Sequence, residues 1–244
     1  METFQDFGET QVPERSAGSI ITHAFEMYKG IFLYAIGAIL LMIAISVIIQ
    51  PVSGFDSDAV MEEMRSSPES FGENIWGIPG IKTYYGLSGL ISILLMPLYV
   101  GIIYLANRYN LKQKLSFSDL FIGYRQNFLN IILYAVISSI IMTIAFAMCV
   151  LPGFFVLPFL LLGYPILLFE NASFSEALSK AFEIGKKNYG TLLGASFLGI
   201  LISICGIFLC GIGIIFTACF YLVVMYSAYC AYCGRPRAIE ENMG

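Results

Sequence analysis

Apolar residues in this chain gather in four blocks, at 31–49, 84–106, 128–169 and 192–232. No Asp, Glu, Lys or Arg stands between Phe128 and Phe169, or between Thr191 and Gly234. A single helix crosses the hydrocarbon core of a bilayer, about 30 Å thick, with roughly 20 apolar residues. The pattern therefore predicts membrane-spanning helices.

The third and fourth blocks are each about twice the length that one crossing needs, because 40 helical residues measure roughly 60 Å. Each block has helix-breaking residues near its middle, Pro152-Gly153 in the third and Gly211-Ile212-Gly213 in the fourth. Proline lacks a backbone donor and glycine tolerates positive φ, so both positions predict turns. The sequence thus predicts an all-α polytopic membrane protein with six transmembrane helices arranged as three hairpins.

Composition supports this prediction and adds an orientation. The 244 residues are 58% hydrophobic and only 12% charged, and the formal net charge is −4. With the N-terminus in the cytoplasm, only Arg65 and Lys82 of the 13 basic residues lie outside. The other 11 lie inside: Arg15, Lys29, Arg108, Lys112, Lys114, Arg125, Lys180, Lys186, Lys187, Arg235 and Arg237. The positive-inside rule then predicts that both termini are cytoplasmic.

The predicted organisation is a polar cytoplasmic tail at 1–16, one six-helix transmembrane domain at 17–234 and a cytoplasmic tail at 235–244. No secretory signal peptide is expected, because the first apolar run starts late and is too long. The outer loop, at about 50–83, carries Asp56, Asp58, Glu62, Glu63, Glu69 and Glu73. These acids lack the spacing of a calcium-binding loop, so whether the loop binds a cation stays open.

The cytoplasmic connections contain an internal repeat. Ser116-Phe117-Ser118-Asp119 and Ser173-Phe174-Ser175-Glu176 place a serine three residues before an acid, the layout of a capping box. Ala24-Phe25-Glu26-x-x-Lys29 also matches Ala181-Phe182-Glu183-x-x-Lys186.

Each repeat predicts a short amphipathic helix ahead of a hairpin. The apolar stripes are Ile20, Ile21, Ala24, Phe25 and Tyr28 in the first, Leu120, Phe121 and Tyr124 in the second, and Ala177, Leu178 and Ala181 in the third. Such a helix lies along the membrane interface with its basic residues at the headgroups. The alternative is a plain connector whose basic ends obey the positive-inside rule.

The repeat resembles a group of uncharacterised bacterial six-helix integral membrane proteins, which includes the membrane domain of some glycerophosphoryl diester phosphodiesterases. The resemblance rests on Phe174-x-Glu176-Ala177-Leu178 and Lys186-Lys187-Asn188-Tyr189-Gly190, with an echo at His23–Gly30. It implies a multi-pass protein of the bacterial cytoplasmic membrane. It does not imply the phosphodiesterase reaction, because the chain has no segment for that catalytic domain.

Few side chains suggest chemistry. His23 and Glu26 are three residues apart and are expected on the polar face of the first amphipathic helix, where a general base or a solvated pair are both open. The six cysteines, Cys149, Cys205, Cys210, Cys219, Cys230 and Cys233, lie in apolar segments. Cys230-x-x-Cys233 has half the ligands of a zinc site, and a reducing cytoplasm keeps such a pair as thiols. We therefore expect no catalytic, cofactor-binding or metal-binding residue.

The spans offer only mild polarity for transport. Hydroxyl groups such as Ser138, Thr143 and Ser203 either line a route or bond within the bundle. The fourth span, 154–169, contains Pro158 and Pro165 and is expected to be irregular. Ala195, Gly199 and Ser203 recur every four residues and predict close helix packing, either inside the bundle or with a second copy.

These observations favour a non-enzymatic component that organises, anchors or assists other membrane processes. The alternative is a transporter or channel for an uncharged or lipid-like small molecule. An enzyme is the third hypothesis and requires His23, Glu26 or Glu170 to converge. The expected partners are membrane lipids; nucleic acid is not expected with this net charge. Protein partners and a homo-oligomer are left open.

Overall fold

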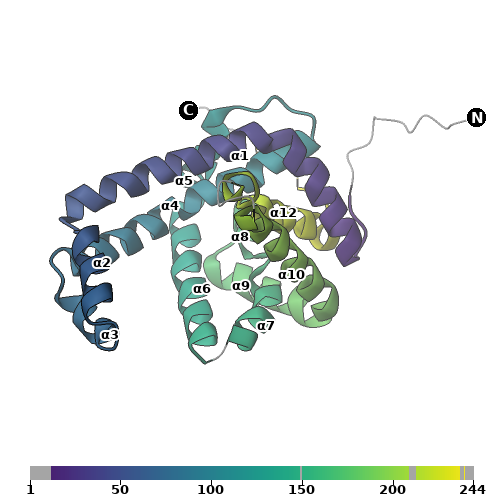
Figure 1. The fold of residues 1–244 in the computed structure, drawn as a ribbon. Coiled ribbons are helices and arrows are strands. Elements are labelled where there is room, and N and C mark those ends of the chain that lie inside the picture. The colour runs from purple at the N-terminus through teal and green to yellow at the C-terminus, as the bar shows by residue number, and fades with distance from the viewer. Residues whose placement is uncertain (1–11, 149, 209–212, 237–238, 240–244) are drawn as a thin grey trace, which may run out of the picture. The chain divides into compact units, whose positions relative to one another are not determined.

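The computed structural model describes residues 12–148, 150–208, 213–236 and 239, and all its regular elements in these ranges are helical. The longer elements in chain order are α1 (Ala17–Ser53), α2 (Ser57–Ser66), α4 (Ile81–Asn110), α6 (Phe128–Met148), α7 (Val150–Leu160), α8 (Gly163–Phe169), α9 (Phe174–Lys187), α10 (Tyr189–Cys205) and α12 (Phe220–Cys233) (Figure 1). The short ones are α3 (Phe71–Asn74), η1 (Ile75–Gly77), η2 (Phe117–Phe121), α5 (Ile122–Arg125), η3 (Gly206–Phe208) and α11 (Ile214–Thr217).

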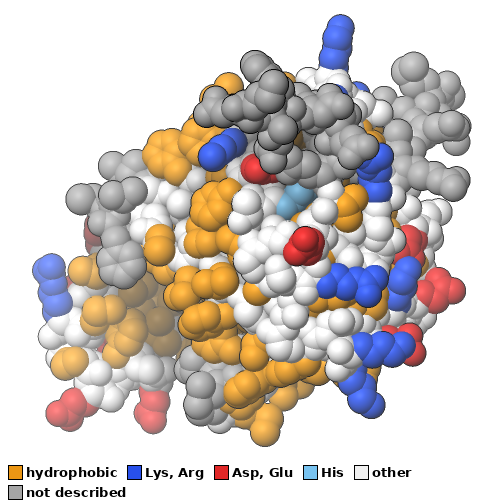
Figure 2. Space-filling model, turned by 90° about the vertical axis from the view of Figure 1, so that its right-hand side faces the viewer, with side chains coloured by type: hydrophobic (Ala, Val, Ile, Leu, Met, Phe, Trp, Pro, Cys, Tyr) orange, Lys and Arg blue, Asp and Glu red, His pale blue; other side chains and the backbone are white. Residues whose placement is uncertain are grey.

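Five helical segments within the described ranges are long and apolar enough to cross a membrane. They are 17–53, 81–110, 128–148, 152–169 and 214–233. The helices α9 and α10, bent by 105° relative to each other, pass the same test only when taken together, so these ranges hold five spans, or six if the bent pair is one span. Figure 2 shows hydrophobic side chains over much of one face, the surface that lipid-facing helices present. The chain is an all-α polytopic membrane protein.

The residues cluster into two compact units. Residues 1–36 and 96–244 form the first, and residues 37–95 form the second. Both α1 and α4 run through the two units.

In the first unit, α6 ends at Met148 and α7 begins at Val150, and Cys149 between them lies outside the described residues. The turn predicted at Pro152-Gly153 is wrong, because both residues lie inside the first turn of α7. Proline is tolerated in a first turn because the amide it lacks has no partner there. The turn predicted at Gly211–Gly213 lies mostly outside the described residues; Gly213 is the N-cap of α11.

The predicted irregularity of the fourth span is confirmed. Pro158 lies inside α7, which ends at Leu160, and α8 starts at Gly163 with Pro165 in its first turn. The crossing is therefore made of two short helices.

The three predicted amphipathic helices differ from one another. The first is not separate, because α1 continues without interruption from Ala17 to Ser53. The second is the 3-10 turn η2 followed by the single turn α5. Only the third, α9, is a distinct helix, which ends at Lys187 before the 105° bend into α10.

Two glycines let segment 117–125 approach the backbone of α4. A Cβ on Gly101 would overlap the backbone of Leu120, and a Cβ on Gly123 would meet the carbonyl of Pro97. Leu120 and Ile122 are accordingly buried. Leu120 of the expected stripe is therefore packed against α4, whereas Phe121 and Tyr124 of the same stripe are exposed.

The small residues of α10 pack against α12. A Cβ on Gly199 would lie 3.1 Å from side-chain atoms of Tyr221 and Val224. The Ser203 hydroxyl donates to the carbonyl of Gly199 (2.9 Å) and accepts from the amide of Tyr221 (3.1 Å). The sequence predicted that these small residues of α10 pack either inside the bundle or against a second copy, and packing inside the bundle is therefore confirmed.

The second unit contains α2 and α3, so the predicted outer loop is largely helical. Asp56 caps α2 by accepting from the amides of Asp58 and Ala59. At the base of this segment Gly80, at φ +77°, lies against the backbone of Gly54, where a side chain would overlap. The rings of Phe55 and Tyr84 stack 4.5 Å apart beside them.

Candidate functional site

A cluster of buried polar side chains joins α1, α4 and α12 within the first unit. Its members, each at most 4% exposed, are His23, Asn107, Asn110, Tyr226 and Ser227. Burying such groups is costly unless they are hydrogen-bonded, so their bonds determine what the cluster does.

His23 of α1 is bonded to α12. Its Nδ1 lies 2.9 Å from the Ser227 hydroxyl, and its ring centroid lies 6.1 Å from that of Tyr226. The two bonded residues are 204 positions apart in the chain. An imidazole beside a serine hydroxyl supplies two of the three members of a catalytic triad, yet Ser227 is fully buried, so no substrate reaches it in this conformation.

Tyr226 bridges the two asparagines of α4. Its hydroxyl accepts from Asn110 Nδ2 (2.9 Å) and donates to Asn107 Oδ1 (3.1 Å). Asn107 and Asn110 share one helix face because they are three residues apart. Asn107 Nδ2 is buried and has no hydrogen-bond partner within the described part of the chain. These asparagines were not predicted as site residues; their only signal in the sequence is two amides three residues apart at the end of an apolar block.

The predicted environment of His23 is wrong. It was placed with Glu26 on a polar face, whereas His23 is buried and Glu26 is exposed. The surroundings of Glu170 differ from those of His23 and Glu26. Its carboxylate accepts hydrogen bonds from Lys180 Nζ (2.6 Å) and from the Tyr229 hydroxyl (3.0 Å). The three residues that an enzyme would have to bring together thus have different surroundings.

A second group of contacts fixes the segment after α4. Arg108 Nη1 lies 2.6 Å from Asp119 Oδ1, and the side chains of the two residues are 21% and 4% exposed. The other carboxylate oxygen of Asp119 accepts from the amide of Ser116 (2.8 Å), which completes the predicted capping box. One carboxylate therefore both starts η2 and ties it to α4.

The capping box predicted at the start of α9 is confirmed. Glu176 Oε2 accepts from the Ser173 amide (2.9 Å), and the Glu176 amide donates to the Ser173 hydroxyl (3.4 Å). The hydrogen bond from the Ser173 backbone, followed by that from its hydroxyl, lowers the pKa of Glu176 from its ordinary value. The charged form of this acid is thus the one that holds the helix start.

One side of α9 consists of small buried residues. Ala177, Ala181 and Gly185 are spaced by four, and a Cβ on Gly185 would lie 2.9 Å from the Phe159 ring and 3.0 Å from the Pro158 carbonyl. Close packing of this kind docks α9 onto α7. The helix is therefore a fixed part of the first unit.

Beside this contact, α6, α7 and α9 line a partly open apolar pocket of about 510 Å³. It is lined by Ile141 of α6, by Val156, Phe159 and Leu160 of α7, and by Leu178, Ser179 and Phe182 of α9. Phe159 and Phe182 stack with their ring centroids 4.8 Å apart. Pockets that bind small molecules have volumes of about 300–1,000 Å³. The sequence could not indicate this pocket, because its walls come from three separate segments.

The other sequence candidates are the cysteines and the hydroxyl groups of the spans. Cys230 is buried and Cys233 partly exposed, and both are free thiols. Cys149 and Cys210 lie outside the described residues. Within the described ranges, no group of three or more His, Cys, Asp or Glu side chains is placed to hold a metal ion. The hydroxyls of Ser138 and Thr143 bond to carbonyls of their own helix.

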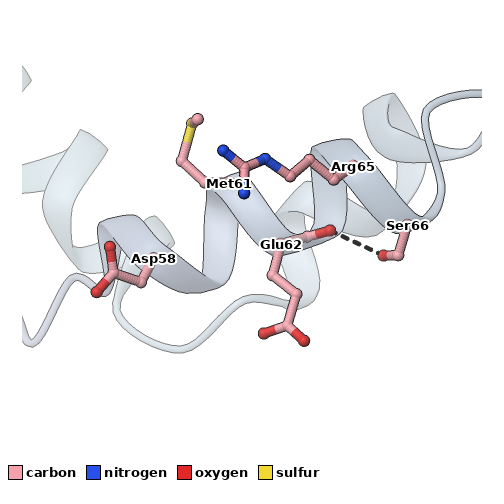
Figure 3. Close-up of a pocket in the computed structure, with 5 residues that line it drawn as sticks. All are labelled: Asp58, Met61, Glu62, Arg65 and Ser66. Carbon is pink, nitrogen blue, oxygen red and sulfur yellow. Dashed lines mark hydrogen bonds between the residues drawn. The ribbon is translucent and has the colours of Figure 1, made fainter.

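The acidic segment that was predicted to lie outside forms a shallow surface on one helix. Asp58, Met61, Glu62, Arg65 and Ser66 line it, all from α2, and the Ser66 hydroxyl donates to the Glu62 carbonyl (2.9 Å) (Figure 3). The carboxylates of Asp58 and Glu62 do not converge on a common point (Figure 3).

No protein-family model matches this chain, and no curated protein or solved structure is significantly similar to it. The resemblance to the membrane domain of glycerophosphoryl diester phosphodiesterases therefore stays a prediction.

Proposed function

We propose that this protein is a non-enzymatic membrane component that organises, anchors or assists other membrane processes. One observation supports this proposal above the others. The buried polar side chains of α1, α4 and α12 bond to one another, through His23 and Ser227 and through Tyr226 and the two asparagines. Groups that could do chemistry are thereby used to hold helices together.

A serine-directed fluorophosphonate probe tests this role of the His23–Ser227 pair. We expect no covalent labelling of the purified protein, because a fully buried hydroxyl cannot reach the probe. Mass spectrometry of the treated protein provides the measurement, and the Ser227→Ala variant serves as the control. Labelling of Ser227 that disappears in this variant would contradict the proposal and indicate a hydrolase.

We also propose that the protein lies in a bacterial cytoplasmic membrane with both termini inside. The proposal is supported by 11 of 13 basic residues lying on one side of the predicted spans. In a cysteine-free background, a membrane-impermeant maleimide applied to intact cells should label Ser57→Cys and leave Gln113→Cys unmodified. The reverse pattern would overturn the orientation.

A second candidate function is a carrier for an uncharged or lipid-like molecule. It is favoured by the apolar pocket between α6, α7 and α9, whose only polar lining residue is Ser179. Binding of such a molecule in this pocket is the first requirement of that function.

A further inference from the structure

The lysines of α9 differ in their partners. Lys180 Nζ contacts Glu170 (2.6 Å), and Lys187 Nζ lies 3.9 Å from Glu183. Lys186 is exposed and makes no ion pair or hydrogen bond within the described ranges. It is thus the lysine of this helix that has no ion-pair partner among the described residues.

Lys186 also lies on the pocket side of the helix. It follows Phe182 by four residues and Ser179 by seven, and a helix advances 100° per residue, so all three lie within about 60° of one another. By the same geometry, Lys187 lies about 140° from Phe182 and faces away from the pocket. An apolar pocket is therefore followed along one helix face by a hydroxyl and an unpaired ammonium group.

We propose that this pocket binds an anionic glycerophospholipid, with an acyl chain between α6, α7 and α9 and the phosphate at Lys186. The walls, including Ile141 and the stacked Phe159 and Phe182, offer hydrocarbon contact, and the volume of about 510 Å³ is that of a ligand-sized site. Basic residues at the headgroup level attract anionic lipid. A zwitterionic lipid gains less, because its own cation already neutralises its phosphate.

The inference rests on the proposed membrane role, because it requires pocket and helix to lie where lipid headgroups are. The charges of α9 support that position. Lys180, Glu183, Lys186 and Lys187 follow one another along the helix outside the buried Ala177–Ala181–Gly185 side, and charged groups are costly in the hydrocarbon core. A helix at 105° to the following apolar span can keep them at the interface.

Tryptophan fluorescence provides the test, since Trp76 is the only tryptophan of the chain. In a Trp76→Phe background, Phe182→Trp places the sole indole at the pocket wall. The protein is reconstituted in vesicles that contain acyl-brominated phosphatidylglycerol or acyl-brominated phosphatidylcholine, which quench tryptophan on contact. We expect a several-fold preference of the quenching site for phosphatidylglycerol over phosphatidylcholine.

Two matched substitutions identify the headgroup contact. Lys186→Gln should reduce the preference for phosphatidylglycerol about fivefold, the change that corresponds to ~1 kcal/mol for one basic residue near an anionic headgroup. Lys187→Gln removes the same charge from the opposite side and should leave the preference unchanged. In parallel, Ile141→Phe should fill the pocket and lower quenching, whereas Ile140→Phe, on the exposed side of α6, should not.

The outcomes separate this inference from the proposed function. Equal quenching by the two lipids, unaffected by Lys186→Gln, would overturn the phospholipid site while leaving α9 in contact with the membrane. An absence of quenching by either lipid would overturn both the site and the interfacial position of α9 in the proposed role. An equal effect of the Lys186 and Lys187 substitutions would also overturn the site, because only general surface charge would then matter.

Discussion

Replacing Gly101 with leucine is expected to detach segment 117–125 from α4 and to destabilise the protein by ~3 kcal/mol or more. The reason is steric, because a Cβ at Gly101 already overlaps the backbone of Leu120, which cannot rotate away as a side chain could. Thermal unfolding of the purified protein in detergent, followed by circular dichroism, measures the loss. Limited proteolysis should show new cleavage between α4 and α6.

The matched control is Gly89→Leu in the same helix. A Cβ at Gly89 meets no other atom within 4 Å, so this change should only gain the better helix propensity of leucine, less than ~1 kcal/mol. If both variants lost equal stability, helix α4 would be intolerant of leucine in general. The close approach of Leu120 to Gly101 would then have no energetic importance.

The sequence predicted those features of the fold that depend on local composition. Spans are recognised because burial in lipid needs long uncharged segments, and the capping boxes at Ser116 and Ser173 need residues only three apart. The all-α architecture with several membrane spans, five or six in the described ranges, and both boxes are accordingly confirmed.

Helix ends were harder to predict because they depend on position within the element. Pro152 signals a turn in isolation, yet in the first turn of α7 it costs no hydrogen bond. The repeated stripe around Ala24 predicted a separate helix, but nothing between Lys29 and Ile31 forces a break, and α1 continues through them. The single glycine there, Gly30, lies inside the helix and leaves room for the Tyr109 ring of α4, because a Cβ at this position would overlap that ring.

The polar cluster could not be predicted because its members are brought together only by the fold. His23 and Ser227 are separated by 204 positions, and Tyr226 and Asn107 by 119. The helical spacing puts His23 on the side of the helix opposite the apolar stripe, so the sequence predicted that His23 is solvated. That prediction would hold if only one side of α1 were buried. Because α12 covers that second side as well, the imidazole is buried and bonds with a serine hydroxyl.

The second large effect is expected from Asp119→Ala. Asp119 is 4% exposed, pairs with Arg108 at 2.6 Å and accepts from the Ser116 amide, so its removal leaves a partly buried guanidinium and an uncapped η2. Breaking a buried ion pair by removing one partner costs about 3–5 kcal/mol. Arg108 is 21% exposed, so we expect a loss near the lower end of this range, measured by thermal or denaturant unfolding in detergent.

Two comparisons isolate the cause of this loss. Glu183→Ala breaks the pair with Lys187, whose side chains are 71–73% exposed and 3.9 Å apart, and should cost only about 0.3–0.5 kcal/mol. Arg108→Leu combined with Asp119→Ala should cost less than Asp119→Ala alone, because no unpaired cation is then left behind. If the double variant were as unstable as the sum of the two single variants, Asp119 would act through the Ser116 cap alone. The ion pair would then contribute nothing to holding segment 117–125 against α4.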